Sequence, residues 1–260
     1  MMTLIDGARV QARVIWALMI RELHTRFGRE NIGFLWIMAE PALFAVGVSA
    51  IWSFIHGSHE HGIGIVAFVI TGYIPLVMWR SCFTRATKAF EANGALMFHR
   101  QVTPIDIIVA RTVLEIYGCM LAAIFTFTGA IMLGFMDVPY DFGLTMLGFC
   151  LQGLFSFATA LICAGLSEMS DTVERVVPVL GYLAIPFSGT FTMVDWLPPG
   201  MRPVLLWSPS VNAVEIFRSG VFGPTIRTHY DVSYTVVICL TLILVGLVIT
   251  KMSRKYILVQ

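Results

Sequence analysis

The chain has 260 residues, of which 57% are hydrophobic and only 13% carry a charge. This composition and the mean hydropathy of +0.81 exclude a soluble globular protein and indicate an integral membrane protein. The formal net charge of +1 says little as a total, because the positions of the basic residues carry the information in a membrane protein. Nothing in the composition implies a nucleic-acid partner.

The first expected element is an amphipathic helix within residues 8–30. Between positions 16 and 29 the apolar residues fall within about 100° of one helical face. The apolar residues are Trp16, Met19, Ile20, Leu23 and Phe27, and the residues placed elsewhere are Arg21, Glu22, Thr25 and Arg29. We therefore expect an interface helix on the membrane surface, with its arginines at anionic headgroups of the inner leaflet. A solvated basic tail is the alternative.

Six later segments are apolar and long enough, or nearly so, to cross a ~30 Å hydrocarbon layer as helices. They are residues 34–55, 63–80, 107–134, 143–166, 176–194 and 233–250. Lys and Arg concentrate before the first segment, between the second and third, and after the last, and these sides are expected to be cytoplasmic. The sequence predicts an all-α integral membrane protein with six transmembrane helices and both termini in the cytoplasm.

Charged residues occur within these apolar segments. Glu40 lies about six residues into the first segment, and Arg111 and Glu115 lie four residues apart in the third. A charge inside a span costs a few kcal/mol unless it faces a cavity or a partner. A structural Glu-Arg cluster between helices and a role in a transport path both remain open.

Motifs for catalysis and metal binding are missing from the sequence. No GxxxxGK[ST] loop is present, so the chain cannot hydrolyse ATP by itself, and there is no GxSxG or HExxH. The first outer loop contains His56, His59, Glu60 and His61, which could hold a metal. Because glycines flank this loop, we expect an exposed polar loop and no metal site.

The connection over residues 81–106 is long for a link between two spans. Its sequence EANGALMFHR, at 91–100, predicts a short amphipathic helix with apolar side chains available to a partner. A merely solvated loop is the alternative.

The fifth apolar segment contains Pro178, Gly181, Pro186 and Gly189, which a membrane helix tolerates where protein or water satisfies its backbone. A helix facing a cavity meets this condition. Residues 195–223 are apolar but too interrupted to span, and they predict a helical hairpin that re-enters the outer leaflet.

Four separated blocks of the sequence resemble one known family. They are RELHTRFGRENIGFLWIMAEP at 21–41, HRQVTPIDIIVARTVLE at 99–115, LLWSPSVNAVEIFRSGVF at 205–222 and SRKYILV at 253–259. In this order they resemble the membrane subunit of ABC-type polysaccharide exporters, closest to the capsular polysaccharide export permeases of Gram-negative bacteria. The resemblance covers nearly the whole chain.

The resemblance implies an inner-membrane homodimer joined to two copies of a separate ATPase chain, which binds ATP and Mg while this chain carries no cofactor. The substrate would be a lipid-linked polysaccharide moved from cytoplasm to periplasm. The 8–30 helix matches the family's interface helix, and 195–223 matches its periplasmic hairpin. The family commonly works with a periplasmic export protein, which is a further candidate partner.

The resemblance also implies residue roles. The helix that docks into the ATPase matches 91–100, with candidates Glu91, Leu96, Phe98, His99 and Arg100. The first and fifth membrane helices match the pair that lines the channel. The candidates for substrate entry and the channel wall are Arg21, Arg26, Arg29, Trp36, Glu40, Tyr182, Phe187 and Phe191. The three aromatic residues of the fifth helix and its end are chosen because rings offer apolar faces to sugar C–H groups, although ordinary packing explains each of them as well.

Three other functions compete with this interpretation. An O-antigen or teichoic-acid exporter differs mainly in its partner ATPase. A polytopic glycosyl- or acyltransferase would use Glu40, Glu115 or the histidine loop as acid or base, and it would work without ATP. A passive channel would conduct ions alone and leaves the apolar 91–100 segment unexplained.

Overall fold

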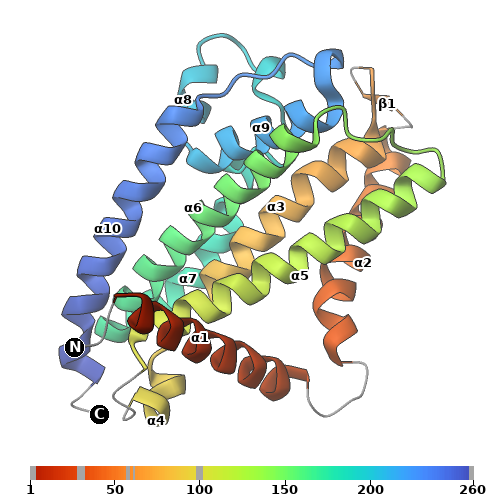
Figure 1. Ribbon diagram of the computed structural model, residues 1–260. Helices are drawn as coiled ribbons and strands as arrows, with labels where there is room; N and C mark the ends of the chain where they lie inside the picture. The colour runs from red at the N-terminus through yellow and green to blue at the C-terminus, as the bar shows by residue number, and fades with distance from the viewer. Residues whose placement is uncertain (1–3, 28–32, 57–58, 61, 98–101, 258–260) are drawn as a thin grey trace.

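The computed structural model describes residues 4–27, 33–56, 59–60, 62–97 and 102–257. Long helices form one bundle, α1 crosses one of its ends, and short elements cover the other (Figure 1). The long helices are α1 (Leu4–Phe27), α2 (Gly33–His56), α3 (Ile65–Arg85), α5 (Pro104–Met132), α6 (Phe142–Met169) and α10 (Val232–Ile257). The shorter elements are β1 (His59–Glu60), β2 (Ile63–Gly64), α4 (Gly94–Met97), α7 (Asp171–Leu183), α8 (Arg202–Leu206) and α9 (Pro209–Phe222). Single 3-10 turns lie at Glu91–Asn93, Ile185–Phe187, Val194–Trp196 and Gly223–Thr225.

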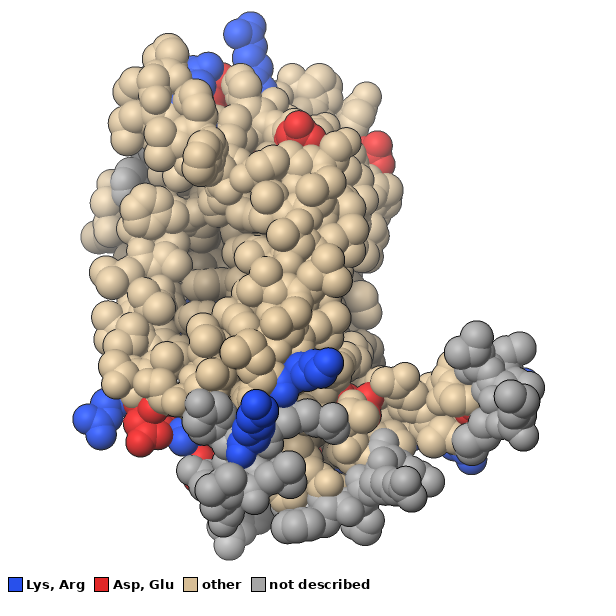
Figure 2. Space-filling model, turned by 90° about the vertical axis from the view of Figure 1, so that its left-hand side faces the viewer, with Lys and Arg blue, Asp and Glu red and all other residues tan. Residues whose placement is uncertain are grey.

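Within the described residues, five helices are long and apolar enough to cross a membrane. They are α2, α3, α5, α6 and α10. On the face shown in Figure 2, Lys, Arg, Asp and Glu gather at the two ends of the molecule and leave a broad uncharged band between them. These features are those of an all-α integral membrane protein.

The observed α7 differs from the predicted fifth span at 176–194. It begins at Asp171, ends at Leu183 and has 13 residues, which is about 20 Å of helix against the ~30 Å hydrocarbon layer. A 3-10 turn containing Pro186 follows, and Gly189 adopts a φ of +72°. Proline removes a backbone donor and the left-handed glycine redirects the chain, so a continuous helix through this segment is excluded.

Local sequence explains where the helices begin. Thr103 precedes α5, and its hydroxyl accepts a hydrogen bond from the Asp106 backbone N–H at 3.3 Å. The Thr103 backbone N–H in turn donates to the Asp106 carboxylate at 2.9 Å. Pro104, in the first turn, has no donor to leave unsatisfied. Asp141 caps α6 by accepting from the Leu144 N–H at 3.0 Å. The predicted third span therefore begins three residues early, at Pro104.

The core lies around α3. In the membrane-length window of α3, 83% of the residues are buried, against 22% in α2 and 17% in α10. Phe68, Ile74 and Met78 of α3 are almost fully buried within the largest apolar cluster. The helices α2 and α10 are therefore peripheral.

The region at 195–223 forms α8 and α9 at the end opposite α1 (Figure 1). Glycines let α9 approach α6 closely: a Cβ at Gly148 would lie 2.4 Å from the Phe217 nitrogen, and one at Gly220 would lie 2.3 Å from the Thr145 nitrogen. Side chains at these two positions would force the helices apart.

The first outer loop contains a short antiparallel pair, with His59 opposite Gly64 and Glu60 opposite Ile63. Sequence reasoning expected a plain polar loop there. Position 61 and the side chains of the other loop histidines lie outside the described part of the structure. Elsewhere in the described chain, no group of three or more His, Cys, Asp or Glu is placed to hold a metal.

Candidate functional site

Five ionisable side chains meet at the end of the bundle crossed by α1, and we call them the basal network: Glu22, Glu40, Arg85, Arg111 and Glu115. The Arg85 guanidinium lies 3.3 Å from the Glu115 carboxylate and 3.9 Å from that of Glu40. Arg111 lies 3.3 Å from Glu22 and donates to the Arg85 carbonyl at 2.9 Å. The network therefore joins α1, α2, α3 and α5.

Burial differs across the basal network. The side chains of Glu22 and Glu115 are about 10% exposed, whereas that of Glu40 is 50% exposed. A Glu-Arg cluster between helices, one of the two alternatives left open by the sequence, is thus present, and Glu40 sits at its edge. Sequence reasoning missed Glu22 and Arg85; the available signal was that the pair of Arg111 and Glu115 needs further partners at the same depth.

The helix α1 presents apolar residues to two sides. Leu18 and Glu22 are buried against the bundle, at 8% exposure each, whereas Trp16 is 64% exposed. The single apolar face expected from the sequence is therefore incomplete, because Leu18 and Glu22 form a second face that packs on α5. The exposed Trp16 and Ile20 suit a membrane surface.

The arginines predicted for substrate entry have different surroundings. Arg21 donates to the Asn93 side chain, so it is directed at the 86–97 segment. Arg26 belongs to α1 and Trp36 to α2, but their side chains lie outside the described part of the structure. Arg29 lies outside the described residues altogether.

Residues 86–97, which we call the coupling segment, follow α3. Phe90 is fully buried beside Leu18 and Ile107, and Leu96 and Met97 pack partly against the same cluster. The helical prediction for 91–100 is confirmed as far as position 97, by the 3-10 turn Glu91–Asn93 and by α4. Phe98, His99 and Arg100 lie outside the described residues.

Polar contacts fix the coupling segment to the corner between α6 and α7. The Glu168 carboxylate accepts from the Phe90 and Glu91 backbone N–H groups at 3.0 and 3.1 Å. Lys88 lies 3.2 Å from both Asp171 and Glu91. The hydrogen bond to Asp171, followed by that to Glu91, raises the pKa of the Lys88 ammonium.

The aromatic candidates for the channel wall fall into two environments. Tyr182 and Phe187 are 64% and 63% exposed, and the Arg80 guanidinium lies 5.5 Å from the Tyr182 ring centre. Phe191 instead stacks on Trp52 of α2, with ring centres 4.8 Å apart and planes 19° apart. Tyr182 and Phe187 are thus available to another molecule, whereas Phe191 is committed to packing.

A buried arginine, Arg218 in α9, organises the loop after α7. Its guanidinium donates to the carbonyls of Gly189 and Thr190 at 2.7 and 2.6 Å, and it lies over the Phe68 ring at 4.2 Å. A Cβ at Gly72 would lie 2.2 Å from the Thr190 carbonyl oxygen, so only glycine fits there. Arg218 was not singled out by the sequence analysis.

Glu215, one turn before Arg218, holds neighbouring backbone. Its carboxylate accepts from the Val194 N–H at 3.2 Å and from the His229 N–H at 3.1 Å. The signal in the sequence was a Glu and an Arg three residues apart within an otherwise uncharged 14-residue helix.

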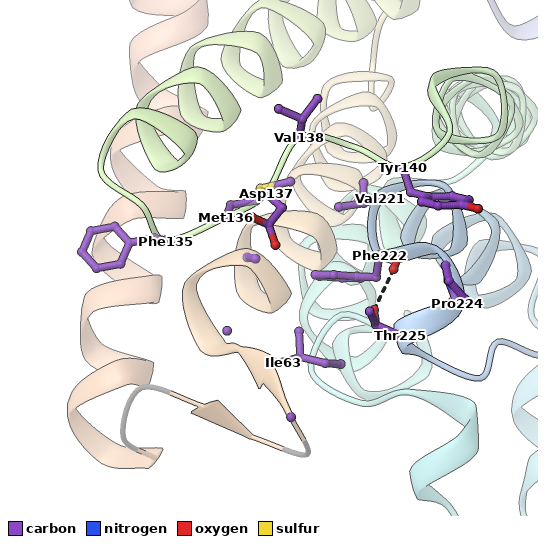
Figure 3. A pocket seen from close by; sticks show the side chains of 13 residues that line it. Ile63, Phe135, Met136, Asp137, Val138, Tyr140, Val221, Phe222, Pro224 and Thr225 are labelled. Atoms are coloured by element: carbon purple, nitrogen blue, oxygen red, sulfur yellow. Dashed lines mark hydrogen bonds between the residues drawn. The ribbon is translucent and has the colours of Figure 1, made fainter.

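A pocket of about 330 Å³ lies between β2, the α5–α6 connection and the end of α9. Figure 3 shows the Asp137 carboxylate turned into this space and Phe135 turned away, while Thr225 bonds to the Phe222 carbonyl at 2.6 Å. Asp137 is the sole charged side chain among the residues that line this pocket, and one carboxylate does not make a cation site.

Membrane-length helices with an ion-pair network at one end of the bundle are the features of a multi-pass membrane protein. The chain belongs to the ABC-2 type transporter family, which matches residues 13–222. Membership in this family implies a partner ATPase.

Curated relatives match over nearly their whole length. The capsule polysaccharide export inner-membrane protein BexB of Haemophilus influenzae is 36% identical over 95% of this chain and 93% of its own. The capsule polysaccharide export inner-membrane protein CtrC of Neisseria meningitidis serogroup B is 35% identical over 96% and 94%. The polysialic acid transport protein KpsM of Escherichia coli is 27% identical over 96% and 97%. Together with the apolar helices, they support a multi-pass inner-membrane protein.

Proposed function

We propose that this chain is the membrane-spanning permease of an ATP-driven exporter that moves lipid-linked capsular polysaccharide from cytoplasm to periplasm. The observation that carries the proposal is the 36% identity to a capsule export protein over 95% of the chain. A capsular substrate is favoured over an O-antigen or a teichoic acid for the same reason. ATP and Mg belong to the partner ATPase.

The proposed orientation places α1, α4 and the basal network at the cytoplasmic end of the bundle. Lys and Arg flank this end in the sequence, and the start of α1 and the end of α10 both lie there (Figure 1). α8 and α9 would then form the periplasmic hairpin, with α9 re-entering the outer leaflet. The short α7 would take part in a sixth crossing of the membrane, beside the five membrane-length helices. The pocket beside Asp137 would face the periplasm.

The proposed assembly is a homodimer with two ATPase subunits. α2 and the exposed side of α7, with Tyr182 and Phe187, would line the passage between the copies. ATP binding would draw the ATPases together and push on the 91–100 helices, so the population of the open state would depend on nucleotide. Phe98, His99 and Arg100 remain candidates for that contact, together with Glu91 and Leu96. The arginines of α1 and its end (Arg21, Arg26, Arg29), with Trp36 and Glu40, remain candidates for substrate entry.

The test is the location of capsular polysaccharide in cells that lack this gene. Surface polymer and polymer retained inside are measured separately, and a strain lacking the partner ATPase gives the reference phenotype. We expect lipid-linked polymer to accumulate in the cytoplasm in both strains, and the intact gene to restore export. Normal surface polymer in the deletion strain would contradict the proposal, and so would loss of polymer on both sides.

A further inference from the structure

The 3-10 turn inside the coupling segment lacks a cap of its own. The 3-10 turn Glu91–Asn93 begins after Phe90, whose side chain cannot accept a hydrogen bond. Glu168, from the last turn of α6, supplies the acceptor instead, because one of its oxygens receives both the Phe90 and the Glu91 N–H. Glu168 is only 9% exposed. Hydrogen bonds from N–H groups to a carboxylate that is shielded from water are strong ones.

Further contacts from the same corner flank this cap. The Ser167 hydroxyl accepts from the Lys88 N–H at 3.0 Å, and the Asp171 carboxylate accepts from the Lys88 ammonium at 3.2 Å. Lys88 has a φ of +51°, a conformation that non-glycine residues adopt rarely and that the surrounding contacts must hold. The segment is thus fixed to both the end of α6 and the first residue of α7.

The two helices of this corner differ in how firmly they are held. α6 packs closely along α9 and α10, with Gly148 against Phe217 and Gly165 against Ile249. α7 has 13 residues, of which only Val177 and Gly181 are buried. A movement applied at the corner therefore displaces α7 more readily than α6.

We propose that Glu168 is a positioning residue: from α6 it fixes residues 90 and 91 at the corner where Lys88 pairs with Asp171, the first residue of α7, so that a push from the ATPase on residues 91–97 moves α7. The inference rests on the proposed function. The opposite end of α7 carries Tyr182 and leads to Phe187, so the same movement reaches the proposed channel wall. Val177 of α7 belongs to the apolar cluster that contains Phe90, so packing also joins the two segments.

The first experiment compares Glu168→Ala with Glu168→Gln in the full permease–ATPase complex in vesicles. ATP hydrolysis and polysaccharide export are measured in the same sample. Glu168→Gln keeps an oxygen acceptor and should retain export. Glu168→Ala should keep the ATPase subunit bound and keep hydrolysing ATP, while export per ATP falls roughly tenfold, the order expected for lost hydrogen bonds to a charged group. Unchanged export per ATP in Glu168→Ala would overturn the proposal.

A charge exchange gives an independent test if Glu168→Ala fails to accumulate. Lys88→Glu alone sets one new carboxylate against those of Asp171 and Glu91 and should uncouple hydrolysis from export. The double variant Lys88→Glu/Asp171→Lys restores an opposite pair across the corner and should recover part of the export per ATP. No recovery in the double variant would count against the proposal, whereas recovery is not expected of a contact that serves folding alone.

Ala92→Asp separates this inference from the proposed docking role. Ala92 is exposed, whereas Leu96 packs against the core of the permease, so a charge at position 92 leaves that packing intact. Ala92→Asp should reduce copurification of the ATPase subunit, and undiminished copurification would contradict the docking role itself. Loss of copurification in Ala92→Asp, together with normal export per ATP in Glu168→Ala, would overturn only the role of Glu168.

Discussion

At the scale of single residues, buried charges hold segments that lack regular structure. The loop after α7 cannot form helix through Pro186 and Gly189, and its carbonyls are left without helical partners. Arg218, which lies on α9, donates hydrogen bonds to several of these carbonyls. Glu215, on the same helix, accepts a hydrogen bond from the Val194 backbone N–H. Such residues are costly to place in an apolar surrounding and more costly to remove once their partners depend on them.

Arg218→Met therefore has a large predicted effect. Removing the guanidinium leaves the Gly189 and Thr190 carbonyls buried without a donor, and the free energy of unfolding should fall by about 3 to 5 kcal/mol. Denaturant titration of the protein in micelles measures it. The matched control is Arg202→Met, because Arg202 also donates to backbone carbonyls, at 3.0 and 2.8 Å, but is 30% exposed. Equal losses in the two variants would contradict the special role of Arg218.

At the scale of elements, packing of α9 on α6 holds together the end of the bundle opposite α1. The two helices approach through Gly148 and Gly220, where a Cβ would meet backbone atoms of the neighbouring helix or of its N-terminal turn. Because backbone cannot move aside as a side-chain tip can, the contact depends on glycine at both positions.

Gly148→Ala should accordingly lower stability although alanine is the better helix former. The added methyl forces α9 away, which costs about 1 to 3 kcal/mol for an overpacked site. Gly129→Ala in α5 is the control, since a Cβ there meets nothing within 4 Å, and it should be neutral or stabilising. Thermal unfolding of both variants in the same detergent measures the two changes in stability. A stabilised Gly148→Ala would show that the close approach is not needed.

Hydropathy predicted the long helices because it depends on local composition. α2, α3, α5, α6 and α10 each overlap a predicted segment. α7 overlaps the predicted 176–194 segment only in part: a hydropathy window excludes its polar first turns, from Asp171 to Arg175, and its end depends on Pro186. A hydropathy profile reports how apolar a segment is and does not locate the turn that ends its helix.

The candidate site could be predicted only in part. Arg111 and Glu115 were recognisable because they lie within an apolar segment. Glu22 and Glu168 depend on how α1 crosses α5 and how the 86–97 segment folds back on α6, and no spacing along the chain records either contact. The pairing of Arg21 with Asn93 likewise requires the tertiary structure.

At the scale of the whole molecule, the peripheral helices α2 and α10 differ in charge. α10 has no charged residue from Val232 to Thr250, so its exposed face suits lipid. α2 carries Glu40, whose side chain is 50% exposed. A carboxylate facing hydrocarbon costs a few kcal/mol, so this side of α2 is expected to face water or a second copy of the chain.

Disulfide crosslinking between copies tests this expectation. Leu43→Cys, close to Glu40 on the exposed part of α2, should form a crosslinked dimer in membranes under mild oxidation. Val237→Cys on α10, which is similarly exposed (61% against 64%), should not. Both are made in a Cys150→Ser background, since Cys150 is an exposed thiol. A dimer formed through α10 and not through α2 would place the copies on the other side of the bundle, and α2 could not then line a passage between them.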